Sequence, residues 1–187
     1  MKKRFWSIVL AICLVLSCVP ITVFAADEVG DEHDFHELLK NLKSGNTITL
    51  DRDYSCALGF DAGKNATIDL NGHVMYFTGQ NHRFRIGFSE YQNKTLTIKD
   101  SNPNAKHTGR FADQPDGGVI VAPGGSSGGG GAVYISEGST LNLEGGTIYN
   151  CNTTGYGGAV YALGKFNMSG GTISNCKASK SGGAICI

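Results

Sequence analysis

The chain has few charged residues and lacks several features that mark common functional classes. Only 17% of its 187 residues are charged, against about 25% in an average protein. No block of basic residues follows the N-terminal Lys2-Lys3-Arg4, and without these three residues 13 basic side chains face 16 acidic ones. A mildly acidic chain of this kind is a poor nucleic-acid binder. No long apolar run follows residue 25, so we expect no membrane span there.

Cysteine spacing and glycine content narrow the fold class further. None of Cys56, Cys151, Cys176 and Cys186 belongs to a Cys-x-x-Cys pair, which argues against a zinc site. Glycine is abundant, with 27 residues, but Gly and Pro together make up only 31 of 187. That share is below the roughly 25–30% typical of disordered chains. The composition therefore predicts one folded domain rich in turns.

The N-terminus has the pattern of an export signal. Lys2-Lys3-Arg4 forms a basic start, Trp6 to Val19 is almost wholly apolar, and Val23-Phe24-Ala25 fits a cleavage site. The Val-Leu-Ser-Cys stretch ending at Cys18 is a weaker match to a lipoprotein site. We expect cleavage after Ala25 and a secreted or cell-surface protein. An even number of remaining cysteines leaves disulfides open in such a protein.

The C-terminal third is an internal repeat. Gly-Gly-Ala-Val-Tyr at 130–134 returns at 157–161, and Gly-Gly-Thr-Ile-Tyr-Asn-Cys at 145–151 returns at 170–176 as Gly-Gly-Thr-Ile-Ser-Asn-Cys. Each unit of about 25 residues holds three short alternating segments, exemplified by 132–135, 140–143 and 147–149. Segments this short gain stability by stacking on equivalent segments of the next unit. The repeat predicts an all-β, right-handed parallel β-helix.

Residues at equivalent repeat positions should stack in adjacent coils. The glycine pairs should form corners that need positive φ or close backbone approach, at Gly146, Gly158, Gly171 and Gly183. Cys151 and Cys176 should be neighbours, either as a disulfide or metal pair or as small buried side chains. We expect a reduced, buried pair, with Asn150 and Asn175 forming a side-chain ladder beside it. Cys186 should point outward.

The first half continues the pattern with irregular coils. Segments 47–50, 66–70 and 96–99 alternate, and 83–88 is a further strand candidate. Ahead of them, a helix carries Phe35, Leu38, Leu39 and Leu42 on one stripe, with Asp31 or Asp34 as its N-cap. We expect this helix to cover the open end of the first coil. The predicted organisation is a signal peptide (1–25), a linker and capping helix (26–46), and a β-helix (47–187) truncated at its C-terminus.

These motifs carry a family resemblance. The segment Ile68-Asp-Leu-Asn-Gly-His73, the segment Leu96-Thr-Ile-Lys-Asp-Ser101 and the Gly-Gly repeats resemble exported right-handed parallel β-helix proteins of Gram-positive, largely clostridial bacteria. Chlamydial polymorphic membrane protein repeats are a looser parallel, and the Ile-x-x-Cys form here departs from their Phe-x-x-Asn form. The resemblance covers roughly residues 33–187. It implies the fold and a role as a surface protein or adhesin, and it implies little about activity.

The residues available for chemistry are few. The richest polar loop holds Lys106, His107, Arg110, Asp113 and Asp116, and His33 and His36 lie on one side of the helix. Both sets are typical of solvated surfaces, so we predict no catalytic residue, no metal and no cofactor. The outward tyrosines are either a stiffening ladder or ligand-facing aromatics, namely Tyr134, Tyr149 and Tyr161.

The sequence therefore predicts a non-catalytic adhesion or binding scaffold whose partners are glycans or host or cell-surface proteins. The alternative is a fragment of a polysaccharide lyase or glycoside hydrolase with a pectate-lyase-like fold. The two differ in whether carboxylates cluster on one face of the coils.

Overall fold

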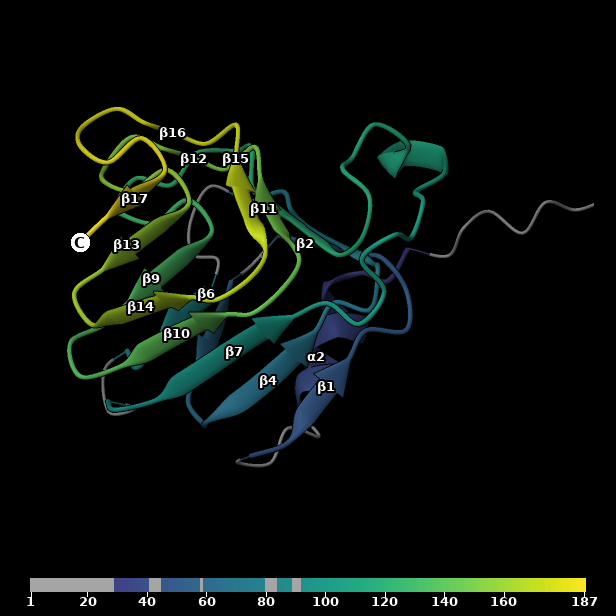
Figure 1. The fold of residues 1–187 in the computed structure, drawn as a ribbon, viewed down its shortest axis with the longest axis horizontal. Coiled ribbons are helices and arrows are strands. Elements are labelled where there is room, and N and C mark those ends of the chain that lie inside the picture. The colour runs from purple at the N-terminus through teal and green to yellow at the C-terminus, as the bar shows by residue number, and fades with distance from the viewer. Residues whose placement is uncertain (1–28, 41–44, 58, 80–83, 89–91) are drawn as a thin grey trace, which may run out of the picture.

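Short strands separated by glycine-rich corners stack into a parallel β-helix, as predicted (Figure 1). The computed structural model describes residues 29–40, 45–57, 59–79, 84–88 and 92–187. The predicted signal peptide lies outside the described residues. No helix in the described part of the chain has the length and apolar character needed to cross a membrane.

Three five-stranded parallel sheets form the sides of the helix. Sheet 1 contains β1 (Thr47–Thr49), β4 (Ala66–Asp69), β7 (Thr95–Lys99), β10 (Thr140–Leu143) and β14 (Lys165–Met168). Sheet 2 contains β2 (Tyr54–Cys56), β5 (Val74–Phe77), β8 (Val119–Val121), β11 (Thr147–Tyr149) and β15 (Thr172–Ser174). Sheet 3 contains β3 (Phe60–Ala62), β6 (Phe84–Ile86), β9 (Val133–Ile135), β13 (Val160–Ala162) and β17 (Ile185–Cys186). A corner pair joins β12 (Asn152–Thr153) to β16 (Lys177–Ala178).

The core follows from in-register pairing of equivalent positions. Ile148 pairs with Ile120 on one side and with Ile173 on the other, so their side chains enter the same interior. The inward residues predicted for the repeat are at most 1% exposed; they are Val133, Ile135, Leu141, Leu143 and Ile148. Alternation thus places one face of every sheet in a single continuous apolar core.

The coils differ in length although their strands remain aligned. Thr147 pairs with Thr172 in the next coil, whereas Thr95 pairs with Thr140, a step along the chain that is nearly twice as long. The longer coil contains loop 100–118, which carries the 3₁₀ helix η1 (Gly109–Phe111). This loop projects from the stack of coils (Figure 1). Insertions therefore enter at corners and leave strand pairing intact.

The helix α2 (Glu32–Lys40) packs on the first coil. Phe35 is buried in the core, with its ring centroid 5.5 Å from that of Tyr54, and Leu38 packs against the same cluster. The Asp34 amide donates to Asp31 Oδ1 at 3.0 Å and the Asp31 amide donates to Asp34 Oδ2 at 3.1 Å, which gives the helix a reciprocal cap. The capping role is confirmed for Phe35 and Leu38. The side chains of Leu39 and Leu42 lie outside what the structure describes.

The corners use left-handed backbone and close approach. Gly146 and Gly171 have φ of 78° and 76°, whereas a Cβ on Gly158 would lie 2.0 Å from the Gly183 carbonyl oxygen. A Cβ on Gly183 itself would meet open space.

The two asparagines predicted to form a ladder lie at equivalent corner positions of successive coils. Asn150 and Asn175 adopt φ of 50° and 53°, a conformation that asparagine tolerates better than most residues. A further pair of stacked asparagines lies on sheet 1, where Asn167 Nδ2 donates to Asn142 Oδ1 at 2.9 Å.

A second apolar cluster covers the outside of sheet 2. Val74, Val119 and Val121 point away from the core, and Phe111 from η1 folds over them. Tyr76 packs there too, with its ring centroid 5.8 Å from that of Phe111. Loop 100–118 is therefore a docked part of the fold.

Candidate functional site

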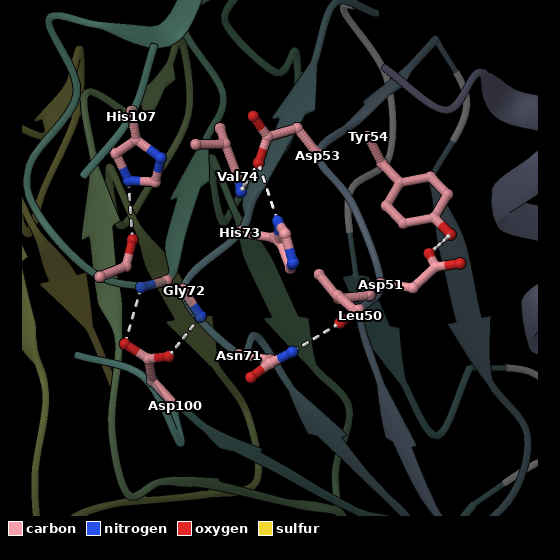
Figure 2. Close-up of polar contacts among 12 residues, drawn as sticks. Leu50, Asp51, Asp53, Tyr54, Asn71, Gly72, His73, Val74, Asp100 and His107 are labelled. Carbon is pink, nitrogen blue, oxygen red and sulfur yellow. Dashed lines mark hydrogen bonds and ion pairs between the residues drawn. The ribbon is translucent and has the colours of Figure 1, made fainter. Parts of the chain in front are cut away.

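A polar cleft of about 330 Å³ lies where loop 100–118 meets the first coils. Its floor comes from the corners between sheets 1 and 2, and its wall comes from the loop (Figure 2). Its ionisable and amide lining residues include Asp51, Asp53, Asn71, His73, Lys106 and His107.

Asp53 and His73 form a carboxylate–histidine pair in this cleft (Figure 2). His73 Nδ1 lies 3.3 Å from Asp53 Oδ1, which also accepts a hydrogen bond from the Val74 amide at 2.8 Å. Burial acts to raise the pKa of Asp53, but these hydrogen bonds outweigh it and hold the pKa below its ordinary value. With Asp53 ionised, Nδ1 carries the proton of a neutral His73, and Nε2 is the ring's proton acceptor.

Asp51 is held by the neighbouring Tyr54. The Tyr54 hydroxyl donates to Asp51 Oδ1 at 2.6 Å, and this bond is the main cause of the lowered pKa of Asp51. Burial, followed by the same hydrogen bond, raises the pKa of Tyr54. Arg52 lies 3.3 Å from the other oxygen of Asp51. Asp51 is thus an ionised acceptor bound on both oxygens.

Asp100 attaches loop 100–118 to the coils, and His107 braces the loop internally. Asp100 accepts hydrogen bonds from the Gly72 amide at 2.8 Å and from the Gly118 amide at 2.7 Å. His107 Nε2 lies 2.8 Å from the Gly117 carbonyl oxygen, so Nε2 carries the proton that this contact needs. The carboxylates around the cleft therefore position backbone and side chains, and His73 Nε2 is the group best placed for proton transfer.

The polar loop singled out in the sequence is divided between two environments. Lys106 and His107 line the cleft, and Lys106 also forms an ion pair with Asp116. Arg110 lies over the rings of Tyr76 and Phe111, at 5.6 Å and 4.9 Å from their centroids.

Sequence reasoning missed the pair of Asp53 and His73. The Asn71-Gly72 turn directly before His73 was a usable signal, because it predicts a corner that faces the preceding coil.

A different kind of surface follows the outer face of sheet 3. Arg85, Tyr134 and Tyr161 are register partners on successive strands. The Tyr161 ring lies edge-on to Tyr134 at 5.7 Å and stacks on Tyr156 at 5.6 Å. Arg85 lies over Phe88 at 4.2 Å. We call these five residues the aromatic strip.

The strip is exposed at both ends and rigid in its middle. Phe88 is 42% exposed and Tyr156 is 38% exposed. Tyr161 rests directly on the backbone at Gly129, where a Cβ would lie 2.2 Å from its ring. Asp61 holds Arg85 through two hydrogen bonds, 2.5 Å to Nε and 2.6 Å to Nη2. Backbone packing therefore supports the Tyr161 ring, and Asp61 orients the Arg85 guanidinium.

The structure separates the three tyrosines that the sequence grouped together. Tyr134 and Tyr161 lie in the strip, whereas Tyr149 lies on sheet 2, paired in register with Val121. Tyr149 packs against the second apolar cluster below Phe111. The alternation that points all three outward carries no information on which side of the helix each strand occupies.

The repeat cysteines stack at the corner after sheet 2. Cys151 and Cys176 are not joined in a disulfide; Cys151 is fully buried and Cys176 is half-buried, so the predicted burial holds for Cys151. A hydrogen bond from the Cys151 side chain lowers the pKa of Cys176 to about 7 against the opposing effect of burial. Cys186 is a free thiol and pairs in register with Tyr161.

The helix offers one exposed cluster of potential metal ligands. Its members are Asp31, His33 and Asp34, whose ligand atoms lie within 4.8 Å of one another. Asp31 and Asp34 already accept the helix-capping hydrogen bonds. The predicted partner of His33 was His36, which is not part of this cluster.

No protein-family model, curated protein or solved structure matches this chain. The resemblance to exported Gram-positive β-helix proteins therefore stays a prediction. The cleft and the aromatic strip are the two structural features that bear on function.

Proposed function

We propose that the protein is an exported, non-catalytic β-helix that binds polysaccharide at a cell surface through its aromatic strip. The observation that carries this proposal is the row in which Tyr134, Tyr161 and Tyr156 contact one another and Arg85, the register partner of Tyr134, lies over Phe88. Both ends of this row are open to solvent. The basic start and apolar run of residues 2–19 support export.

The chemistry of the strip suits sugars. A tyrosine ring presents an apolar face to the C–H face of a sugar and a hydroxyl to its polar groups. Because the strip lies on a hydrogen-bonded sheet, little side-chain entropy is lost when a ligand binds. Successive strands repeat about every 4.8 Å, so the strip offers a regular row of contacts to a polymer.

The test is binding to a panel of purified polysaccharides: cellulose, xylan, chitin and polygalacturonate. We expect the protein to bind at least one polymer and Tyr156→Ala to weaken that binding at least tenfold. Tyr149→Ala is the matched control, because it removes an outward tyrosine that lies outside the strip. Failure to bind any polymer, or equal binding by Tyr156→Ala, would reject the proposal.

The cleft favours a second candidate function, cleavage of a polysaccharide with His73 as the proton acceptor. One observation supports it: His73 Nδ1 lies 3.3 Å from the Asp53 carboxylate, and in the tautomer that donates to Asp53 the Nε2 atom is free to act as a base. Such a base accepts a proton from a water molecule in hydrolysis, or from the carbon next to a uronate carboxyl in elimination.

Its test is the release of new reducing ends or of unsaturated, ultraviolet-absorbing products from the same panel. On this candidate the protein has activity, and His73→Gln lowers it about a hundredfold or more. The absence of any product, or an active His73→Gln variant, would eliminate the cleft as a catalytic site.

A further inference from the structure

The last coils carry charge of one sign. After Glu144 the charged residues of the sequence are Lys165, Lys177 and Lys180, and no acidic residue follows Glu144. All three lysines are exposed. By contrast, residues 29–70 contain eight acidic and four basic side chains. Charge therefore changes along the helix axis, from acidic in the coils next to α2 to basic in the coils after Glu144.

One end of the aromatic strip lies within this basic region. Lys180 Nζ is 4.9 Å from the centroid of the Tyr156 ring. The Lys180 amide donates to the Gly155 carbonyl oxygen at 3.0 Å, which holds this loop beside Tyr156. Lys177 begins β16 and pairs with Asn152 of the preceding coil. Lys180 thus lies beside Tyr156, and Lys177 lies on the neighbouring corner strand of the same coil.

The charges at the two ends of the strip are not equivalent. Arg85 is neutralised by its two hydrogen bonds to Asp61. Among the residues that the structure describes, no carboxylate forms an ion pair with Lys177 or Lys180. An incoming anion therefore competes with no internal partner at the Tyr156 end.

We propose that the strip selects anionic polysaccharides, with uronate carboxylates bound by Lys180 and Lys177 and sugar rings stacked on Tyr156. This inference rests on the proposed function of the strip. A lysine ammonium on a flexible stem can follow carboxylates along a polymer. The positive end also steers an anionic chain toward the rings, and this attraction weakens as salt screens it.

Polygalacturonate and its fully methyl-esterified form are the matched probes, because they share a backbone and differ in charge. We expect binding to polygalacturonate to be at least tenfold tighter at low salt, with the preference shrinking as sodium chloride is raised. Lys180→Gln should remove most of the preference, and the double variant with Lys177→Gln should abolish it. Lys165→Gln, on sheet 1, is the matched control and should change it little.

The outcomes separate this inference from the proposed function. Equal binding of both polymers, lost in Tyr156→Ala, overturns the anionic preference and keeps the strip as a polysaccharide site. If the protein binds only the neutral polysaccharides of the wider panel, the anionic preference is likewise overturned and the strip remains a polysaccharide site. If Lys165→Gln weakens binding as much as Lys180→Gln does, the attraction comes from overall charge and the assignment to the strip is overturned. Binding of no polymer overturns both proposals.

Discussion

Inward and outward residues alternate on both sheets 2 and 3, but the outward residues of the two sheets differ in how far they are buried. On sheet 2, Val74, Val119 and Val121 are buried because loop 100–118 folds back and places Phe111 over them. On sheet 3, the row of Tyr134 and Tyr161 stays half-buried and ends in the exposed ring of Tyr156. In this β-helix, an outward residue becomes buried where a loop folds over its sheet, as loop 100–118 does on sheet 2.

The largest expected effect concerns the covered face. Phe111→Ala should lower the free energy of unfolding by about 3 kcal/mol, because the substitution removes a buried aromatic ring and leaves a cavity. Chemical denaturation measures the loss. Polysaccharide binding should be unchanged, since the strip lies on another sheet. A loss below about 0.5 kcal/mol, typical of surface positions, would show that the loop is not docked in solution.

A Tyr→Ala substitution should lower stability by different amounts on the two faces. Tyr149→Ala should cost about 1–2 kcal/mol of stability, because this ring packs in the second apolar cluster. Tyr156→Ala should cost only about 0.5 kcal/mol, because its ring is 38% exposed. Thermal or chemical unfolding of both variants checks the order. If Tyr156→Ala were the more destabilising, the strip would be a structural ladder.

A smaller effect on stability is expected at the Arg85 end of the strip, where Asp61 neutralises the arginine. Asp61→Asn breaks a partly exposed ion pair, so stability should fall by less than about 1 kcal/mol. The variant also leaves Arg85 without its carboxylate partner, which should tighten binding to polygalacturonate. Asp116→Asn, which breaks the ion pair of Lys106 away from the strip, is the control. Weaker binding by Asp61→Asn would contradict the role given to charge.

The smallest effect is a shift in thiol reactivity. The rate of Cys176 alkylation by iodoacetamide should rise with pH around a midpoint near 7, because the Cys151 hydrogen bond stabilises the thiolate. Cys151→Ala removes that hydrogen bond, so the midpoint should move upward. Mass spectrometry after timed labelling gives the rate at each site. A midpoint unchanged by Cys151→Ala would mean that the two thiols do not interact.

The repeat made the second half of the fold predictable. The recurrence of the Thr147 segment at Thr172 reveals both the strands and their register. The first half hides this signal, because its coils vary in length: the step from Thr47 to its partner Thr67 is less than half of that from Thr95 to Thr140. Strands β2, β3, β5 and β8 were missed for that reason. The capping helix was predictable, since its apolar stripe and Asp31 are local features.

The candidate sites were predictable only in part. Alternation correctly points Tyr134 and Tyr161 outward, and their equivalent places in the repeat stack them in adjacent coils. Tyr149 also points outward but lies on sheet 2, where loop 100–118 places Phe111 over the neighbouring valines, and no local pattern specifies that docking. Asp53 and His73 meet across two coils of unrelated sequence. The Asn71-Gly72 turn marks the corner locally, but only the long-range register between the coils brings the two side chains together.

The long coil also shows where the β-helix can accept an inserted segment. Between β7 and β8 the chain makes the excursion 100–118, yet β7 and β8 still pair with their neighbours on both sides. The corner between β7 and β8 therefore behaves as a position at which a foreign segment can be displayed, provided that the strands on either side keep their lengths. A lineage of such proteins could exchange loops between corners and acquire new specificities while the supporting frame stays unchanged.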